Sequence, residues 1–460
     1  MNKSPGIKKW RTRCAIAAAL ILIVLLVFEH QLHAPGIRMG KPLPQGKVRP
    51  QLVNAGDIAL LLAPDGSLWA WGGTQSKLAW NGTGSRLMGV FPQPSISEVP
   101  LRVGADSDWT QVASGGSYTV ALKSDGSLWA WGWNGEGEVG QANLTNHYGA
   151  PTRIGRETNW TQICAGVAHT VALKIDGSLW AWGFNNRGQL GDGTTNNISV
   201  PSMIGVDRDW QAIAAHVNNT LALKRNGTIW RWGSQSNSGN ELLTPTQMEP
   251  GTNWQAISAY DFNLLALKTD GTLWLSSMLV GAGVYINAAS AFASGHTDNF
   301  TQVGRDQDWI EIHAGWISFF ARKNDGSWWG CGLNYEGQLG LGTHVLCAPS
   351  PRRLPFSFEP WVFAPGQGTT LLLGLDGKLW TWGRRLGLSG PSATRQKFEA
   401  FLAPAVKRFP AFRFLIKSDI DQTPHLLWEL PPEVRRSLGT GPNGSTNDPT
   451  TAHPAGPSHE

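Results

Sequence analysis

Charged residues are scarce in this 460-residue chain, since Asp, Glu, Lys and Arg together make up 15% of it. The formal net charge of +5 is matched by five basic residues that precede residue 14 with no acid among them, so the remainder of the chain sums to 5 − 5 = 0. Those five residues are Lys3, Lys8, Lys9, Arg11 and Arg13. A protein that binds a phosphate backbone needs a positive surface on its folded part. The charge distribution therefore predicts no nucleic-acid partner.

Motifs for catalysis and for bound groups are also missing. The sequence contains no G-x-S-x-G, no Walker loop, no Cys-x-x-Cys and no HExxH pattern. The histidines are scattered, and His169 stands where other repeats described below have Tyr118 or Asn219, which is typical of a hydrogen-bonding strand position. We therefore expect no catalytic residue, no metal site and no cofactor. An enzyme acting in a central channel is the least favoured interpretation, because no pair of acids stands out.

Only four cysteines are present. Cys14 falls in an apolar run and Cys164 in a strand-like segment, while Cys331 replaces a tryptophan of its repeat and Cys347 follows in the same repeat. Two interpretations stay open for Cys331 and Cys347. They form a disulfide, which a location outside the cytoplasm would allow, or they are two unrelated buried thiols.

Glycine and tryptophan are abundant, with 55 and 24 copies, and they recur in one pattern. The sequence DGSLWAWG and its close variants occur at residues 65–72, 125–132, 176–183, 226–233, 270–277, 325–332 and 376–383. Asp-Gly or Asn-Gly favours a tight two-residue hairpin turn. The flanking runs, such as YTVALK and SLWAWG, are apolar and strand-like. Seven hairpins spaced by about 50 residues predict a repeat protein.

A further tryptophan precedes most of the hairpins at a fixed distance, in SDW, TNW, RDW, TNW and QDW. These tryptophans are Trp109, Trp160, Trp210, Trp254 and Trp309, and we place Trp361 with them. Fixed spacing indicates one rigid unit that is copied. We expect all tryptophans of the chain to form the repeat core except Trp10, Trp80, Trp316 and Trp428.

A glycine-rich loop follows the hairpin, clearest as WGFNNRGQLGDGT at 182–194 and CGLNYEGQLGLGT at 331–343. Together with the ALKxDGSLWAWG hairpin, the Pro-x-x-Ile-Gly turn and the Asp-Trp, this loop resembles the repeats of the regulator of chromosome condensation family. The resemblance covers roughly residues 47–390 and implies an all-β fold, a seven-bladed β-propeller with about four strands per blade. The need to bury apolar surface favours the same fold. A single four-stranded sheet cannot bury both of its faces, whereas seven sheets stacked in a ring can.

The N-terminus reads as an export or anchoring segment that precedes the propeller. Residues 1–13 form a basic head, which we expect in the cytoplasm, and 14–28 (CAIAAALILIVLLVF) form an uncharged apolar helix. No A-x-A cleavage pattern follows, which favours an uncleaved single-pass anchor with the propeller outside the cytoplasm. A cleaved signal and secretion is the alternative, since fifteen residues are few for a ~20-residue span. Residues 29–46, rich in proline, read as a linker.

The two ends of the repeat region look incomplete. The first hairpin lacks the upstream Trp signature, and the last is followed by a degenerate loop. We therefore expect the propeller to span 47–410, with one blade built from both termini. Residues 411–436 are then a C-terminal extension on an outer edge, and 437–460 (GTGPNGSTNDPTTAHPAGPSHE) a disordered tail.

Two connections between repeats are longer than the others, one after residue 72 and one after residue 277. Insertions in repeat folds gather on one face and often bind. Their large or charged side chains are the candidate binding residues: Trp80, Arg86, Phe91, Tyr285, Phe292 and His296. The interpretation is a membrane-anchored, non-catalytic module that binds a protein partner on one face of the ring. The resemblance implies two alternatives, a guanine-nucleotide exchange factor-like regulator of a small GTPase and a secreted propeller that inhibits an enzyme.

Overall fold

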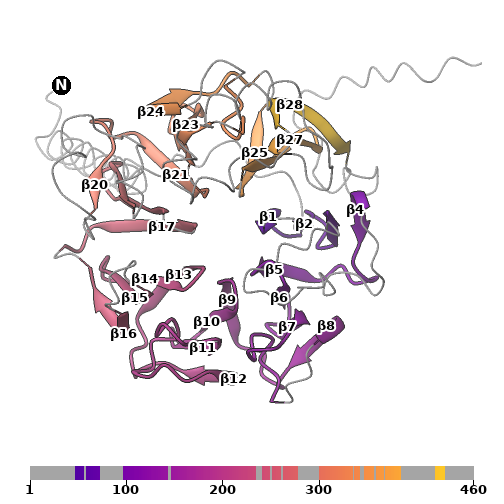
Figure 1. Cartoon of the computed structure of the whole chain (residues 1–460), viewed down its shortest axis with the longest axis vertical. Coiled ribbons are helices and arrows are strands. Elements are labelled where there is room, and N and C mark those ends of the chain that lie inside the picture. The colour runs from indigo at the N-terminus through magenta and orange to yellow at the C-terminus, as the bar shows by residue number, and fades with distance from the viewer. Residues whose placement is uncertain are drawn as a thin grey trace, which may run out of the picture.

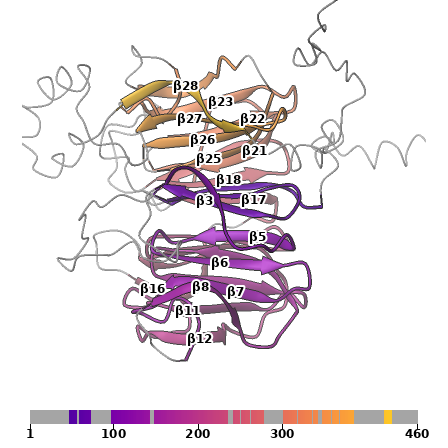
Figure 2. The same cartoon turned by 90° about the vertical axis from the view of Figure 1, so that its right-hand side faces the viewer.

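The computed structural model describes residues 47–55, 58–72, 97–142, 147–234, 241–248, 251–260, 263–277, 300–316, 318–334, 336–341, 347–356, 359–366, 368–384 and 420–429. They form seven four-stranded antiparallel sheets, arranged as blades around a ring (Figure 1). The predicted all-β, seven-bladed β-propeller is therefore confirmed. Each blade uses four consecutive strands, and the first strand of each lies nearest the centre. Figure 2, which shows the ring from its edge, displays the strands of successive blades as stacked layers.

The first blade consists of β1 (Gln51–Ala55), β2 (Ile58–Leu62), β3 (Leu68–Gly72) and β4 (Ser97–Arg102), and the second of β5 (Trp109–Ser114), β6 (Tyr118–Lys123), β7 (Leu128–Trp133) and β8 (His147–Ile154). The third consists of β9 (Trp160–Ala165), β10 (His169–Lys174), β11 (Leu179–Gly183) and β12 (Ile198–Met203), and the fourth of β13 (Trp210–His216), β14 (Asn219–Lys224), β15 (Ile229–Ser234) and β16 (Glu241–Gln247). The last three consist of β17 (Trp254–Tyr260), β18 (Asn263–Lys268), β19 (Leu273–Ser277) and β20 (Thr301–Gln302); β21 (Trp309–Ala314), β22 (Ser318–Lys323), β23 (Trp328–Leu333) and β24 (Cys347–Arg353); and β25 (Pro360–Pro365), β26 (Thr369–Gly374), β27 (Lys378–Arg384) and β28 (Ile420–Glu429).

The turn between the second and third strands explains the repeated sequence. In the second blade, Asp125 Oδ1 accepts the backbone N–H of Ser127 at 2.9 Å, and the Ser127 hydroxyl accepts the indole N–H of Trp129 at 2.8 Å. Gly126 has a φ of +76°, and a Cβ there would lie 2.2 Å from the carbonyl oxygen of Thr158, in the connection to the next blade. Glycine is therefore needed for the backbone conformation and for the close approach.

The hydrophobic core lies between neighbouring blades. Trp182 of the third blade is fully buried, and it packs with Tyr118 and Leu122 of the second blade. Its indole N–H donates to the Glu138 carbonyl oxygen, also of the second blade, at 3.0 Å. Each blade thus buries one face against each of its two neighbours, which is why a single blade could not be stable alone.

The ring closes through a contact between the first and last blades. Asn54 is buried, and its amide donates to the carbonyl oxygens of Ala364 at 3.3 Å and Thr369 at 3.0 Å. A similar contact joins the fifth and sixth blades, where the Asn263 amide donates to the Gly315 carbonyl oxygen at 2.8 Å. The contact between the first and last blades, which we call the closing seam, is therefore stabilised by buried hydrogen bonds like those between other neighbouring blades.

The blade expected to combine both termini is not found, and the expected boundary at residue 410 is wrong. β1 to β4 complete the first blade, and β28 pairs with β27 as the fourth strand of the last. The outer edge of β27 needs a hydrogen-bonding partner, and part of the expected extension at 411–436 supplies it. A signal for this strand exists in the sequence: Pro424 and Leu427 repeat the spacing of Pro151 and Ile154 in β8. The expected tail at 437–460 lies outside the described residues.

Replacing Asn54 with alanine should lower the free energy of unfolding by about 1–2 kcal/mol, because the hydrogen bonds from its amide to two carbonyl oxygens of the last blade are lost. Urea denaturation of the purified chain measures this. Asn196→Ala serves as the control, since Asn196 is exposed on a connection and should change stability by less than about 0.5 kcal/mol. An Asn54 variant as stable as the control would show that the closing seam does not depend on this amide.

The structure tests the expected disulfide but not the expected N-terminal segment. The basic head, the apolar helix at 14–28 and the linker to residue 46 lie outside the described residues. Within the described part of the chain, no helix has both the length and the apolar character to cross a membrane. The disulfide considered for Cys331 and Cys347 is not formed: both thiols are free, and Cys331 Sγ donates to the Ala348 carbonyl oxygen at 3.2 Å.

Candidate functional site

The propeller has two distinct faces. We call the side with the seven Asp-Gly or Asn-Gly turns the turn face, and the opposite side, where third strands connect to fourth strands, the loop face. The two connections that the sequence singles out run from Gly72 to Ser97 and from Ser277 to Thr301, and both join a third strand to a fourth, as does the longer connection from Arg384 to Ile420. Both therefore leave and rejoin the ring on the loop face. The six candidate residues within them, Trp80, Arg86, Phe91, Tyr285, Phe292 and His296, lie outside the described residues.

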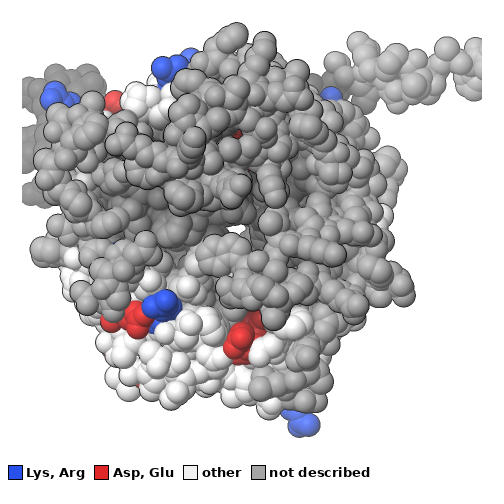
Figure 3. Space-filling model, viewed as in Figure 1, with Lys and Arg blue, Asp and Glu red and all other residues white. Residues whose placement is uncertain are grey.

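Charged side chains on the side of the ring seen in Figure 3 occur in a few separate groups among the described residues. Arg187 pairs with Glu241 at 2.7 Å, and Asn197 donates to Glu136 at 2.7 Å. No set of three His, Cys, Asp or Glu side chains in the described ranges is placed to hold a metal ion.

His169 has the structural role that its repeat position predicts. It is buried, and its Nε2 lies 3.1 Å from the hydroxyl oxygen of Thr220 in the next blade. Burial lowers the pKa of His169 to about 3, so the ring is neutral at ordinary pH. Its equivalent Tyr118 hydrogen-bonds through its hydroxyl to the third blade in the same way.

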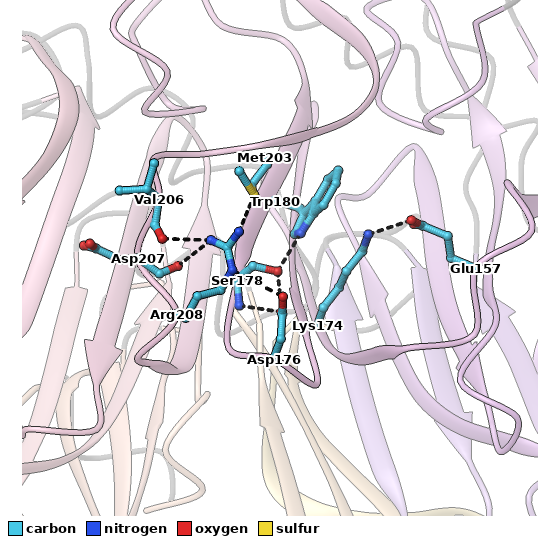
Figure 4. A network of polar contacts seen from close by, with 9 residues as sticks. All are labelled: Glu157, Lys174, Asp176, Ser178, Trp180, Met203, Val206, Asp207 and Arg208. Carbon is cyan, nitrogen blue, oxygen red and sulfur yellow. Dashed lines mark hydrogen bonds and ion pairs between the residues drawn. The ribbon is translucent and has the colours of Figure 1, made fainter.

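The turn face carries one cluster that repeats from blade to blade. In the third blade, the Lys174 ammonium lies 3.5 Å from the Trp180 ring centroid and pairs with Glu157 at 2.8 Å (Figure 4). It also lies 4.6 Å from the ring centroid of Trp160. The same arrangement of a lysine over two tryptophans recurs at Lys123, Lys224, Lys268 and Lys323. In each cluster the lysine contacts tryptophans on the strands to either side of its own. The charged residues of these clusters therefore stabilise the packing of the blade.

Arg208 illustrates how the connections on the turn face are fixed. Its guanidinium pairs with Asp176 at 3.3 Å and donates to the carbonyl oxygens of Val206 at 2.9 Å and Asp207 at 3.1 Å (Figure 4). The neighbouring Lys224 shows the electrostatic consequence. Burial alone would lower its pKa, but its hydrogen bonds to Asp207 and Asp209 raise the pKa above the ordinary value.

The seam between the sixth and seventh blades departs from this repeat. The register pairs Arg322 with Glu311 and with Trp328. In all six other blades the position of Arg322 is leucine: Leu62, Leu122, Leu173, Leu223, Leu267 and Leu373. One blade alone therefore places a guanidinium where the others bury an aliphatic side chain.

The facing strand of the seventh blade departs as well. Pro360 pairs with Gly374 as Trp109 pairs with Lys123, so Pro360 holds the place of the repeat tryptophan, and the expectation that Trp361 holds it is wrong. In five other seams the N–H of that tryptophan donates to the turn glycine of the preceding blade, as Trp160 does to Gly126 at 3.3 Å. Proline has no N–H and cannot make this bond.

Four polar side chains meet at this seam, and we call Arg49, Glu311, His313 and Arg322 the seam cluster. Glu311 is paired with Arg322 at 3.0 Å, His313 at 3.0 Å and Arg49 at 3.6 Å. The side chain of Glu311 is 16% exposed, whereas that of Arg49 is 67% exposed. Burial alone would raise the pKa of Glu311, but the hydrogen bond from His313 and the charges around it lower that pKa below its ordinary value.

Aromatic rings support the seam cluster from within the seam. The ring of His313 lies 5.7 Å from that of Trp328, which in turn lies 4.2 Å from Phe363 of the seventh blade. Phe320 stacks on Phe363 at 5.2 Å. His313 is thus held by aromatic packing, whereas Arg49 at the edge of the cluster stays exposed.

Sequence reasoning missed the seam cluster, although a signal was present. Aligning the hairpins places FARK (320–323) against VALK and LALK of other repeats, which marks Arg322 as a charged residue in a leucine column. The contribution of Arg49 had no comparable signal, because it depends on ring closure.

The repeats match known sequences over part of the chain. A model of the regulator of chromosome condensation (RCC1) repeat matches residues 125–173 and 176–223, and a second model of that repeat matches 109–138 and 160–189. The ultraviolet-B receptor UVR8 of Arabidopsis thaliana is 30% identical over 149 residues, which are 32% of this chain and 32% of that protein. The mitochondrial RCC1 domain-containing protein RUG3 of the same plant is 32% identical over 138 residues, 30% of this chain and 29% of that protein. The chain spans about a third or less of the length of these curated relatives.

Solved structures with the same fold cover more of the chain. Prp20p from Saccharomyces cerevisiae aligns with a TM-score of 0.62 at 17% identity, covering 84% of this chain and 88% of that one. Human WBSCR16 aligns with a TM-score of 0.57 at 18% identity, covering 74% of this chain and 93% of that one. At these identities the likeness establishes the fold alone.

Proposed function

We propose that the protein is a membrane-anchored propeller, lying outside the cytoplasm, that binds a protein partner through its loop face without catalysis. The observation that carries this proposal is that the long connections all begin and end on the loop face. The turn face, by contrast, is occupied by lysine, tryptophan and acid side chains that hold neighbouring blades together. Insertions in repeat folds often bind, so the connections that begin and end on the loop face support a partner contact there.

The similar proteins support a binding role and differ in what they bind. The structure of Prp20p is described with its binding properties to Gsp1p and histones, and a second structure shows yeast RCC1 bound to Kap60. A retinitis pigmentosa GTPase regulator homolog of Caenorhabditis elegans is 32% identical over 149 residues, which cover 10% of that protein. This relative supports the alternative of a regulator of a small GTPase. Because one fold serves several partners, the partner must be identified on this chain.

The proposed location rests on the basic head and the apolar run before the propeller. An uncleaved anchor predicts that the native protein begins at or near Met1 and fractionates with membranes. N-terminal sequencing and membrane fractionation of the native protein measure both properties. A mature chain that starts after the apolar run would support secretion instead.

The loop-face contact is tested on the two long connections. A partner is first captured by crosslinking on intact cells and purified, and its affinity for the chain is then measured by calorimetry. Trp80→Ala and Tyr285→Ala should each weaken binding by about tenfold or more, since large aromatic side chains dominate interfaces. Val206→Ala is the matched control, because Val206 is 82% exposed on the turn face. Unchanged affinity in both loop variants would rule out the loop face, and capture of a small GTPase would favour the alternative function.

A further inference from the structure

The seam cluster has more cationic groups than its own acid requires. Arg49 and Arg322 contribute two positive charges and Glu311 one negative charge, so the arginines exceed the acid by 2 − 1 = 1 positive charge. Arg322 uses one terminal nitrogen on Glu311, while its Nε is buried and has no hydrogen-bond acceptor. Leaving a guanidinium N–H buried and unpaired is costly, and a bound acceptor would remove that cost.

Arg49 reaches this site from another blade. It precedes β1 of the first blade, whereas Glu311 lies on β21 of the sixth, so their contact passes the inner strand of the seventh blade. Figure 1 shows the inner strands of these three blades, β1, β21 and β25, side by side around the ring's centre. At 67% exposure, Arg49 is accessible to a ligand that enters there.

A backbone donor points to the same place. In three other blades a glutamine holds the position of Glu311. Its side-chain oxygen accepts a backbone N–H from the first strand of the following blade, as Gln111 does from Ile163 at 2.8 Å. Phe363 holds the position of Ile163 in the seventh blade, and no described residue accepts its N–H. Glu311 instead faces His313 and the two arginines.

We propose that the seam cluster binds a carboxylate of an acidic peptide segment, held by the guanidinium groups of Arg322 and Arg49. Paired guanidinium donors match the planar carboxylate, and they bind it in bidentate geometry. The excess of one positive charge fits a monoanion, whereas the ionised Glu311 beside the site repels a phosphate dianion. The site is independent of the proposed loop-face contact, because its residues come from β21, β22 and the segment before β1 and not from the long connections.

The test measures binding of a fluorescein-labelled tetra-glutamate peptide to the purified full-length chain by fluorescence anisotropy. Arg322→Leu and Arg49→Gln should each weaken binding by about fivefold or more. Leucine is the residue of the other six blades at position 322, so that variant retains the fold. Arg156→Gln removes one exposed charge from the turn face and is the matched control, with binding expected within about twofold of wild type.

Glu311→Gln gives a change of opposite sign that a purely structural ion pair would not produce. Glutamine occupies this position in three blades, and removing the negative charge should strengthen binding of the tetra-glutamate peptide by about threefold or more. A tetra-glutamine peptide should not bind. Wild-type affinity in Arg322→Leu, or weaker binding in Glu311→Gln, would overturn the proposal. Displacement of the peptide by phosphate more readily than by acetate at equal ionic strength would overturn the carboxylate assignment.

Discussion

Replacing Trp182 with alanine should lower the free energy of unfolding by about 3–5 kcal/mol, the largest effect of any single substitution considered for this ring. Trp182 is fully buried in the seam between the second and third blades, where it packs 6.2 Å from the Trp160 ring. Its indole N–H also donates to the Glu138 carbonyl oxygen across the seam. Truncation therefore leaves a cavity and removes one of two hydrogen bonds to the Glu138 carbonyl oxygen, which keeps the bond from the Thr170 hydroxyl. Urea denaturation followed by circular dichroism measures the loss.

Alanine variants of two other tryptophans give reference values for this loss of stability. Trp133 is 40% exposed, and its replacement by alanine should cost less than about 1 kcal/mol. Trp180 is partly buried and covers Lys174 on the turn face, so Trp180→Ala should fall between these two values. If Trp182→Ala were no more destabilising than Trp133→Ala, the core would not lie in the seams as the structure places it.

The sequence was sufficient for the hairpins and the number of blades because each turn carries its own local chemistry. Asp125, Gly126 and Ser127 determine the turn without help from distant residues, and the same three-residue pattern recurs around the ring. The sequence could not distinguish the two tryptophans of one hairpin. Trp180 and Trp182 lie two residues apart on one strand, yet only Trp182 enters the inter-blade core.

The outer strand of the last blade was missed because fourth strands have the weakest pattern. β28 shares with β8 only the proline and an aliphatic residue three positions later, and a long segment separates it from β27. The seam cluster was missed for a different reason. Arg49 and Glu311 come from blades that flank the seventh, so their contact follows from closure of the ring and from no local pattern.

Glu138 should make the stability of the propeller depend on pH. It occupies the loop position of Gln189, and like that residue it accepts a backbone N–H, here from Glu136 at 2.8 Å. Gln189 also donates to Asn218 at 3.2 Å, whereas Glu138 Oε1 is buried without a partner. Burial raises the pKa of Glu138 from 4.5 to about 7, despite the hydrogen bond from the Glu136 backbone.

The sign of the effect follows from which state binds the proton. Below pH 4.5 the carboxyl group of Glu138 is protonated in both states and carries no penalty. As the pH rises to about 7 the unfolded chain releases this proton while the folded chain retains it, so folding loses stability, by about 3 kcal/mol once the pH exceeds 7. Glu138→Gln should therefore raise the free energy of unfolding by up to about 3 kcal/mol at pH 8 and by much less at pH 4.

The reciprocal variant separates this charge effect from a general gain in packing. Gln189→Glu places a carboxyl group in the equivalent buried loop of the third blade, so it should destabilise the ring at pH 8 and have a much smaller effect at pH 4. Urea denaturation at both pH values measures each variant against the wild-type chain. A gain in Glu138→Gln that is equal at pH 4 and pH 8 would mean that the amide improves hydrogen bonding and that Glu138 is not a buried, titrating acid. Opposite changes in the two variants, confined to the higher pH, would instead identify the charge at this single loop position as the cause.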